Sequence, residues 1–373
     1  MQDRTNRVVP IGGVTASVGA GWSGFRALRV VGKTLEDEAR TLCSFELVAA
    51  DGGPLPEFLP GQFLTFRLEV PDPASGVMRV VTRCYSLSDR PGLDRYRISV
   101  KRVPGGVASG FLHDAVSVGG TLQALAPSGS FVLEPGEAPV VLIAGGIGIT
   151  PFLSMIHTQI AIDPNREVWL FYGVRDAREQ GWHDHLALLS EDCPGFRYFA
   201  CHSRPGADER AGRDYHHAGR VDITLLRLSL SLRLYHFYLC GPPGFMETLT
   251  PALEAWGVPA DRLHSEAFVS PPGPVSSPAP VIGAGSEAEG RWVTFRQTGK
   301  TVPWDGSVET LLECAEAHGI DAPFGCRGGI CGACQTPLVQ GKVEYLYNPE
   351  FTPDPGTCLP CVVRPLTDLI VAL

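Results

Sequence analysis

The stretch Cys326-Arg327-Gly328-Gly329-Ile330-Cys331-Gly332-Ala333-Cys334 lies near the C-terminus and decides how the last part of the chain must fold. Its spacing is C-x4-C-x2-C, the ligand spacing of a plant-type [2Fe-2S] cluster. Glycines between the thiols permit the tight loop, because they tolerate positive φ. A zinc knuckle or a run of buried cysteines is the alternative, but zinc loops usually repeat C-x2-C and lack the x4 gap. The stretch therefore predicts that Cys326, Cys331 and Cys334 bind an iron–sulfur cluster.

The fourth ligand has two candidates, Cys358 and Cys361, and the spacing alone leaves both open. At this point the chain resembles the ferredoxin domains at the C-termini of NAD(P)H-dependent iron–sulfur reductases. Their last ligand is followed by two residues and then by Arg-Pro-Leu, as in Cys361-Val362-Val363-Arg364-Pro365-Leu366. The resemblance implies that Cys361 is the fourth ligand and that this domain has an α+β, β-grasp fold.

Composition limits the class of protein. The 373 residues suffice for two or three domains, and 44% hydrophobic with 19% charged residues is typical of a globular protein. A net charge of −9 argues against nucleic acid as a partner. Eleven cysteines in a long chain argue against a disulfide framework and favour a reducing compartment, so we expect a cytoplasmic protein. No apolar run near the N-terminus is long enough to span a bilayer, so no membrane is expected either.

The first large segment is rich in short β-type runs broken by glycine and proline. After a tail at 1–22, this pattern predicts an antiparallel β-barrel domain at 23–137. The expected strands lie at 25–31, 42–48, 62–68, 80–87, 96–102 and 121–126.

The pattern then changes to uninterrupted apolar runs, each followed by helical sequence. This alternation predicts an α/β domain with a parallel sheet at 138–269. Its expected strands lie at 140–144, 168–172 and 237–240. A stretch rich in proline, glycine and serine at 270–290 reads as a linker, and the ferredoxin domain at 291–373 follows it.

Two motifs in the barrel segment predict a flavin site. Arg83-Cys84-Tyr85-Ser86 ends a strand, and an ordinary edge strand is the alternative for this tetrapeptide alone. The glycines and serine within 104–114 open a helix whose N–H groups and dipole suit a pyrophosphate. Together they resemble the flavin domain of the ferredoxin–NADP reductase family, most closely the reductase portion of flavohaemoglobins.

The resemblance implies roles for the matching residues. Arg83 pairs with the flavin phosphate, Tyr85 packs on the ribityl chain and ring, and Ser86 hydrogen-bonds near flavin N5 as a catalytic residue. The implied cofactor is FAD, with FMN as the alternative, because related phthalate-type reductases use FMN with a similar motif. The remaining predicted flavin residues are Cys84, Lys101, Gly106, Val107, Ala108 and Ser109.

The turn after the strand at 140–144 predicts a nucleotide site. It reads G-x-G-x-x-P from Gly146 to Pro151, so Pro151 replaces the third glycine of the Rossmann pattern. Glycines let the backbone approach a phosphate, and Thr150 is expected to cap the following helix. An ordinary strand–helix turn is the alternative. The same reductase family shows this turn at its nicotinamide nucleotide, which implies a site comprising Gly145, Gly146, Gly148, Thr150 and Pro151.

Other short fragments extend this nucleotide site. Cys240-Gly241-Pro242 follows a buried strand, and the resemblance implies that Cys240 aligns hydride transfer; a buried packing thiol is the alternative. Glu266, as a catalytic residue, and Phe268 resemble the family's closing segment at the flavin. Ser203-Arg204 suits a 2′-phosphate, whereas the run 207–213 resembles that of NADH-dependent flavohaemoglobins, so NADH or NADPH is expected with a preference for NADH.

Taken together, these signatures predict an NAD(P)H-dependent reductase that passes electrons through a flavin and a [2Fe-2S] cluster. The domain order resembles the reductase components of Rieske-type oxygenases and demethylases, which implies a separate terminal oxygenase or another electron acceptor protein as partner. A stand-alone NADH oxidase, a hybrid-cluster-protein reductase and a non-enzymatic redox sensor are the alternatives.

Overall fold

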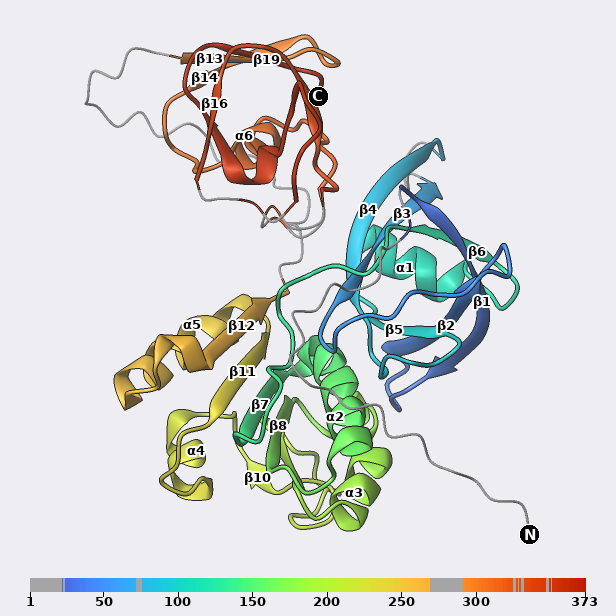
Figure 1. Ribbon diagram of the computed structural model, residues 1–373, viewed down its shortest axis with the longest axis vertical. Helices are drawn as coiled ribbons and strands as arrows, with labels where there is room; N and C mark the ends of the chain where they lie inside the picture. The colour runs from blue at the N-terminus through green and yellow to red at the C-terminus, as the bar shows by residue number, and fades with distance from the viewer. Residues whose placement is uncertain are drawn as a thin grey trace.

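The computed structural model describes residues 22, 24–71, 76–268, 291–324, 327, 329, 332–346, 349 and 351–373. Its main sheets follow one another along the chain, and Figure 1 shows three units built on them. We call them the barrel unit (24–137), the parallel-sheet unit (138–268) and the C-terminal unit (291–373). The predicted fold class is confirmed, since each predicted domain contains one whole main sheet.

The barrel unit is a curled antiparallel sheet in the order β4-β3-β6-β1-β2-β5. A bridge between Leu87 and Ile98 joins the two edge strands. Helix α1 (Val107–Asp114) packs on β3 and β5 and places Leu112 in the unit's core. All six predicted strands are present, as β1 (Arg26–Leu35), β2 (Leu42–Ala49), β3 (Phe63–Pro71), β4 (Met78–Ser86), β5 (Tyr96–Lys101) and β6 (Thr121–Ala124).

Trp22 is the one described residue of the predicted tail, and it belongs to the barrel. Its indole Nε1 donates to the Ala124 carbonyl at 3.0 Å, and its ring packs against the barrel core. Trp22 is thus in contact with the barrel unit, and the boundary of the tail stays a prediction. The rest of the tail and the linker at 270–290 lie outside the described residues.

The parallel-sheet unit has the strand order β10-β9-β8-β7-β11-β12, and every neighbouring pair is parallel. The chain leaves β7 toward β8 on one side and later returns to β11 on the other, so the order reverses between β7 and β11. The strands are β7 (Val140–Gly145), β8 (Val168–Val174), β9 (Phe196–His202), β10 (His217–Ala218), β11 (His236–Gly241) and β12 (Leu263–Ala267).

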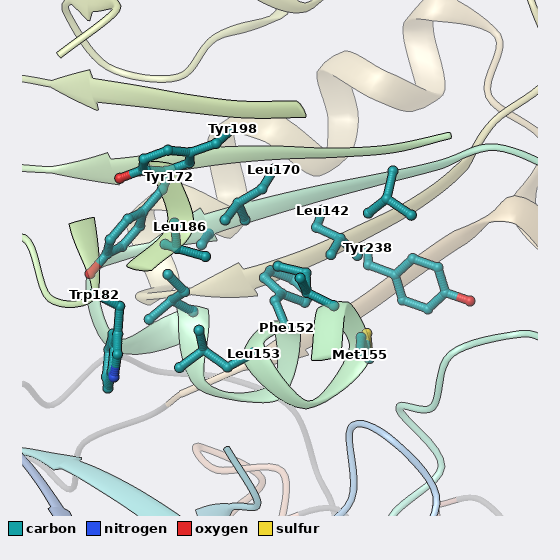
Figure 2. Packing of buried hydrophobic residues seen from close by; sticks show 14 of the residues in the cluster. Leu142, Phe152, Leu153, Met155, Leu170, Tyr172, Trp182, Leu186, Tyr198 and Tyr238 are labelled. Carbon is teal, nitrogen blue, oxygen red and sulfur yellow. The ribbon is translucent and has the colours of Figure 1, made fainter. Parts of the chain in front are cut away.

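Helices cover both faces of this sheet, which explains why its strands are apolar on both sides. On one face, α2 and α3 pack Phe152, Leu153 and Leu186 against the sheet, as Figure 2 shows. On the other face, α4 and α5 contribute Leu226 and Leu249 to a second cluster. The helices are α2 (Thr150–Ile162), α3 (His183–Asp192), α4 (Ile223–Ser229) and α5 (Pro243–Trp256).

The C-terminal unit is a mixed five-stranded sheet in the order β14-β13-β19-β15-β17, with a separate β16–β18 pair. Its helix α6 (Leu311–Ala317) begins where Thr310 and Glu313 form a capping box. The strands are β13 (Arg291–Phe295), β14 (Lys300–Trp304), β15 (Thr336–Gln340), β16 (Val343–Tyr345), β17 (Thr357–Cys358), β18 (Val363–Pro365) and β19 (Leu369–Val371).

Candidate functional site

The candidate nucleotide site lies where the order of the parallel strands reverses, between the carboxyl ends of β7 and β11. Ligands of open α/β sheets bind at this type of switch point. Gly148 packs so closely on β11 that an added Cβ would meet the Cys240 carbonyl oxygen at 2.0 Å. Gly146 has φ +55 and open space where its Cβ would be. The turn is therefore pressed against β11 on one side and accessible to a ligand on the other.

The hydroxyl of Thr150 does not cap helix α2 as expected. Residues 146–149 form a 3-10 turn that runs directly into α2, so Thr150 is already the first helical residue. Its Oγ1 donates to the Ile147 carbonyl at 3.1 Å and thereby stabilises the glycine turn. Pro151 occupies the first turn of α2, where its missing N–H costs nothing.

Cys240 is the next-to-last residue of β11 and pairs in register with Glu266 of β12. The Cys240 thiol is fully buried, and burial, followed by the charge of Glu266, raises its pKa well above the usual range. Cys240 therefore remains a neutral thiol. Phe268 donates its backbone N–H to the Gly241 carbonyl at 3.2 Å, so the structure brings the predicted residues at 240, 241, 266 and 268 together beside the glycine turn. Pro242 starts the turn into α5 as its N-cap residue.

The predicted flavin motif lies at the carboxyl end of β4, paired with β3. Tyr85 lies beside Phe66, with ring centroids 5.9 Å apart, and burial raises the pKa of its phenol. Cys84 Sγ lies 3.3 Å from Thr65 Oγ1, and Ser86 is buried opposite Phe63.

The loop before α1 has the geometry of a phosphate-binding turn. Gly105 has φ +70 with open space at its Cβ position, and Gly106 is the extended N-cap residue. Ser109 Oγ accepts from the Val103 N–H at 3.1 Å and donates to the Gly106 carbonyl at 3.3 Å. The Ser109 side chain thus fixes the loop, while Val107 and Ala108 provide the first-turn N–H groups of α1.

Lys101 makes a contact that the sequence does not predict. Its Nζ forms an ion pair with Glu179 Oε2 at 2.8 Å, and Glu179 belongs to the parallel-sheet unit. Arg175 pairs with the other oxygen of Glu179 at 3.0 Å. Lys101 therefore joins the two units, and its place in the flavin site stays a prediction.

The candidate cluster site lies in the C-terminal unit. Cys334 Sγ lies 3.1 Å from Cys361 Sγ, and both side chains are buried. Two thiols this close suit ligands of one iron–sulfur centre. Cys326 and Cys331 lie outside the described residues. Cys358, the alternative fourth ligand, is buried in β17, where burial followed by the charge of Cys361 raises its pKa to about 12.

Glycines shape the described part of the cluster loop. Gly329 has φ +69 and Gly332 has φ +66, which glycine adopts without strain. A Cβ on Gly332 would meet the Phe351 ring at 2.4 Å, and one on Gly329 would meet Pro349 at 2.9 Å. Gly329 and Gly332 are thus packed closely against the segment that precedes β17.

Ser203 and Arg204 follow β9 at the same sheet edge as the glycine turn. Their N–H groups donate to the carbonyls of Val174 and Arg175, and both side chains are exposed. Sequence reasoning missed the buried network beneath them: His202 Nε2 lies 2.7 Å from Gln180 Oε1, and His202 Nδ1 lies 2.5 Å from Glu209 Oε2. The signal available was the position of His202 at the end of a buried strand.

Comparison with known proteins identifies the architecture. Residues 142–250 match the oxidoreductase NAD-binding domain, and residues 293–366 match the 2Fe-2S iron-sulfur cluster binding domain. The flavohem-like FAD/NAD binding domain of a nitric oxide dioxygenase from Vibrio cholerae is 31% identical, with a TM-score of 0.58, over 66% of this chain and 99% of that chain. The chain belongs to the ferredoxin–NADP reductase-like family of flavoprotein reductases. It thus combines an oxidoreductase NAD-binding domain with a 2Fe-2S cluster binding domain.

Two further relatives show how this reductase is arranged. A Deinococcus radiodurans flavohemoprotein is 40% identical over 70% of this chain, and the chain spans 62% of that protein's length. Phthalate dioxygenase reductase is 26% identical, with a TM-score of 0.58, over 94% of this chain and 98% of that chain. These matches agree with the predicted FAD, NAD(P)H and [2Fe-2S] cluster. Within the described residues, no helix has the length and apolar character needed to cross a bilayer.

Proposed function

We propose that this protein passes electrons from NAD(P)H through FAD and a [2Fe-2S] cluster to a separate terminal oxygenase or demethylase. The observation that carries the proposal is the pair of thiols, Cys334 and Cys361, in the same chain as the nucleotide switch point. Phthalate dioxygenase reductase supports it, because that protein and this chain match over nearly their whole lengths. When bound, a nicotinamide, a flavin and a [2Fe-2S] cluster would together supply the chemistry that converts an electron pair into single electrons.

The protein's own residues position these groups. The glycine turn at 145–148 and the neutral thiol of Cys240 define where the nicotinamide lies. The loop at 105–109 holds the flavin phosphates, and the motif ending at Ser86 holds the flavin ring. Cys326, Cys331, Cys334 and Cys361 bind the cluster.

A stand-alone NADH oxidase is the second candidate, because the flavohemoprotein match shares the barrel and parallel-sheet units but not the C-terminal unit. A redox sensor is the non-enzymatic alternative. Fast NADH-dependent reduction of cytochrome c through the cluster, with little oxygen consumption, distinguishes the proposed reductase from both. We also expect NADH to be preferred over NADPH, and a cytoplasmic location.

Two cysteine variants test the proposal directly. We expect Cys361→Ser to lower bound iron and cytochrome c reduction at least about tenfold, because loss of a direct ligand must cost no less than loss of a supporting residue. NADH-dependent ferricyanide reduction, which the flavin alone supports, stays unchanged. Cys358→Ser is the matched control and keeps both iron and activity. If Cys358→Ser loses the cluster and Cys361→Ser keeps it, Cys358 is the fourth ligand and Cys361 is not. A wild-type protein that stays free of iron after anaerobic reconstitution would refute the proposal.

A further inference from the structure

The ring of Phe324 contacts two arginine side chains from different units. Phe324 lies two positions before Cys326, the first predicted cluster ligand. The guanidinium carbon of Arg327 lies 4.2 Å from the ring centroid, and that of Arg83 lies 4.7 Å from it. Both distances fall within the range of cation–π attraction. Arg83 belongs to β4 of the barrel unit, which Figure 1 shows beside the C-terminal unit.

The C-terminal side of this contact is held firmly. The guanidinium of Arg327 forms a two-pronged ion pair with Glu316 of α6, in which Nη1 lies 3.1 Å from Oε2. Arg327 also has φ 57, a left-handed conformation that a non-glycine residue adopts at a cost. Backbone strain of this kind persists at functional sites, where the surrounding structure maintains it. Arg327 therefore links the Phe324 ring to Glu316 of α6.

The barrel side of the contact is equally defined. Arg83 Nη1 donates to the Thr82 carbonyl at 2.7 Å, which holds the guanidinium close to β4. Strand β4 is fixed in turn by its register with β3, where Arg83 lies opposite Phe66. Arg83 is also the first residue of the predicted flavin motif. The side chain that the resemblance pairs with the flavin phosphate therefore also contacts Phe324, two positions before Cys326.

We propose that Phe324 is a positioning residue that docks the C-terminal unit on the flavin-bearing strand β4, with Arg83 as its contact on that strand. The docked arrangement brings the cluster loop beside the flavin motif and so favours electron transfer between them. The role of Phe324 in electron transfer rests on the proposed function, whereas its contact with Arg83 does not. Docking forms and breaks no covalent bond. A substitution at Phe324 changes only the fraction of molecules in which the C-terminal unit is docked on β4.

Two variants test the role of the ring. Phe324→Leu keeps an apolar side chain but removes the π face, whereas Phe324→Tyr keeps the π face. Stopped-flow absorbance separates reduction of the flavin by NADH from reduction of the cluster by the flavin. We expect Phe324→Leu to slow the second step about fivefold, which corresponds to about 1 kcal/mol at 1.4 kcal/mol per tenfold change and lies in the cation–π range. The first step stays unchanged, and Phe324→Tyr restores the second.

Arg227→Leu is the matched control. It removes the contact between Arg227 and Trp256, in which the guanidinium carbon lies 5.5 Å from the ring centroid. Both residues belong to the parallel-sheet unit. This variant leaves the second step at the wild-type rate. If Phe324→Leu lowers the iron content, Phe324→Met takes its place, because methionine fills a similar volume without a π face.

Amide hydrogen exchange across 78–86 gives a readout that needs no electron flow, and we expect faster exchange there in Phe324→Leu. An unchanged second step and unchanged exchange in Phe324→Leu would refute the docking role while leaving the proposed function intact. Wild-type protein whose cluster is never reduced by NADH, together with faster exchange in Phe324→Leu, would refute the proposed function and support the contact.

Discussion

At the scale of single residues, Gly148 shows most directly how this fold depends on a missing side chain. A Cβ at this position would lie 2.0 Å from the Cys240 carbonyl oxygen and 2.4 Å from its carbon, both in the backbone of a buried strand. We predict that Gly148→Ala lowers the free energy of unfolding by about 1–3 kcal/mol, the usual cost of overpacking, and weakens NADH binding. Urea denaturation with a parallel KM measurement checks this. Gly110→Ala is the control, because Gly110 is helical with open space at its Cβ position, and alanine there should be neutral or stabilising. Equal stability of the two variants would contradict the prediction.

At the scale of elements, the loop after β4 is tied to α2 by an ion pair between Asp89 Oδ1 and His157 Nδ1 at 2.9 Å. Burial alone would raise the pKa of Asp89, but the hydrogen bond from His157 and the charge of Arg97 outweigh it and lower the pKa to about 2. Because the folded value lies below the usual 3.8, the stabilisation is fully present above pH 3.8 and is lost as the pH falls toward 2. We predict that the free energy of unfolding of the wild type exceeds that of Asp89→Asn by about 1–2 kcal/mol near neutral pH. This difference in free energy disappears as the pH falls from 3.8 toward 2. Chemical denaturation at several pH values measures the gap. Asp114→Asn, which alters an exposed ion pair with Arg102, should show little difference at any pH. A gap that persists unchanged at pH 2 would contradict the assignment.

How far the sequence predicts these elements depends on the distance over which each signal acts. The barrel strands and the buried strands β7, β8 and β11 were predictable, because alternation and apolar runs are local. The thiol spacing of Cys326, Cys331 and Cys334 is local in the same sense. The ion pair of Lys101 with Glu179 joins residues 78 positions apart, and the contact of Arg83 with Phe324 joins two units. No local pattern encodes such partners, so the sequence indicates neither the ion pair of Lys101 nor the contact of Phe324. The sequence predicts Thr150 as the cap of α2. In the structure the preceding 3-10 turn moves the start of the helix to Thr150, and this turn depends on packing against β11, which no local pattern shows.

At the scale of the whole molecule, the C-terminal unit has a hydrophobic cluster of its own, whereas Leu42 and Phe131 of the barrel unit belong to the cluster of the parallel-sheet unit. The C-terminal cluster draws only on residues 293–373, and the Vibrio cholerae relative is a domain of its own that corresponds to the first two units. We therefore predict that a fragment ending at residue 268 folds and binds FAD. It should reduce ferricyanide with NADH at close to the full-length rate, since those electrons leave from the flavin, yet lose cytochrome c reduction that passes through the cluster. Steady-state assays of the fragment beside the full chain measure both activities, with flavin content as the check on folding. Cytochrome c reduction retained in the fragment would mean that electrons leave this protein from the flavin, and that the C-terminal unit serves another purpose than the relay.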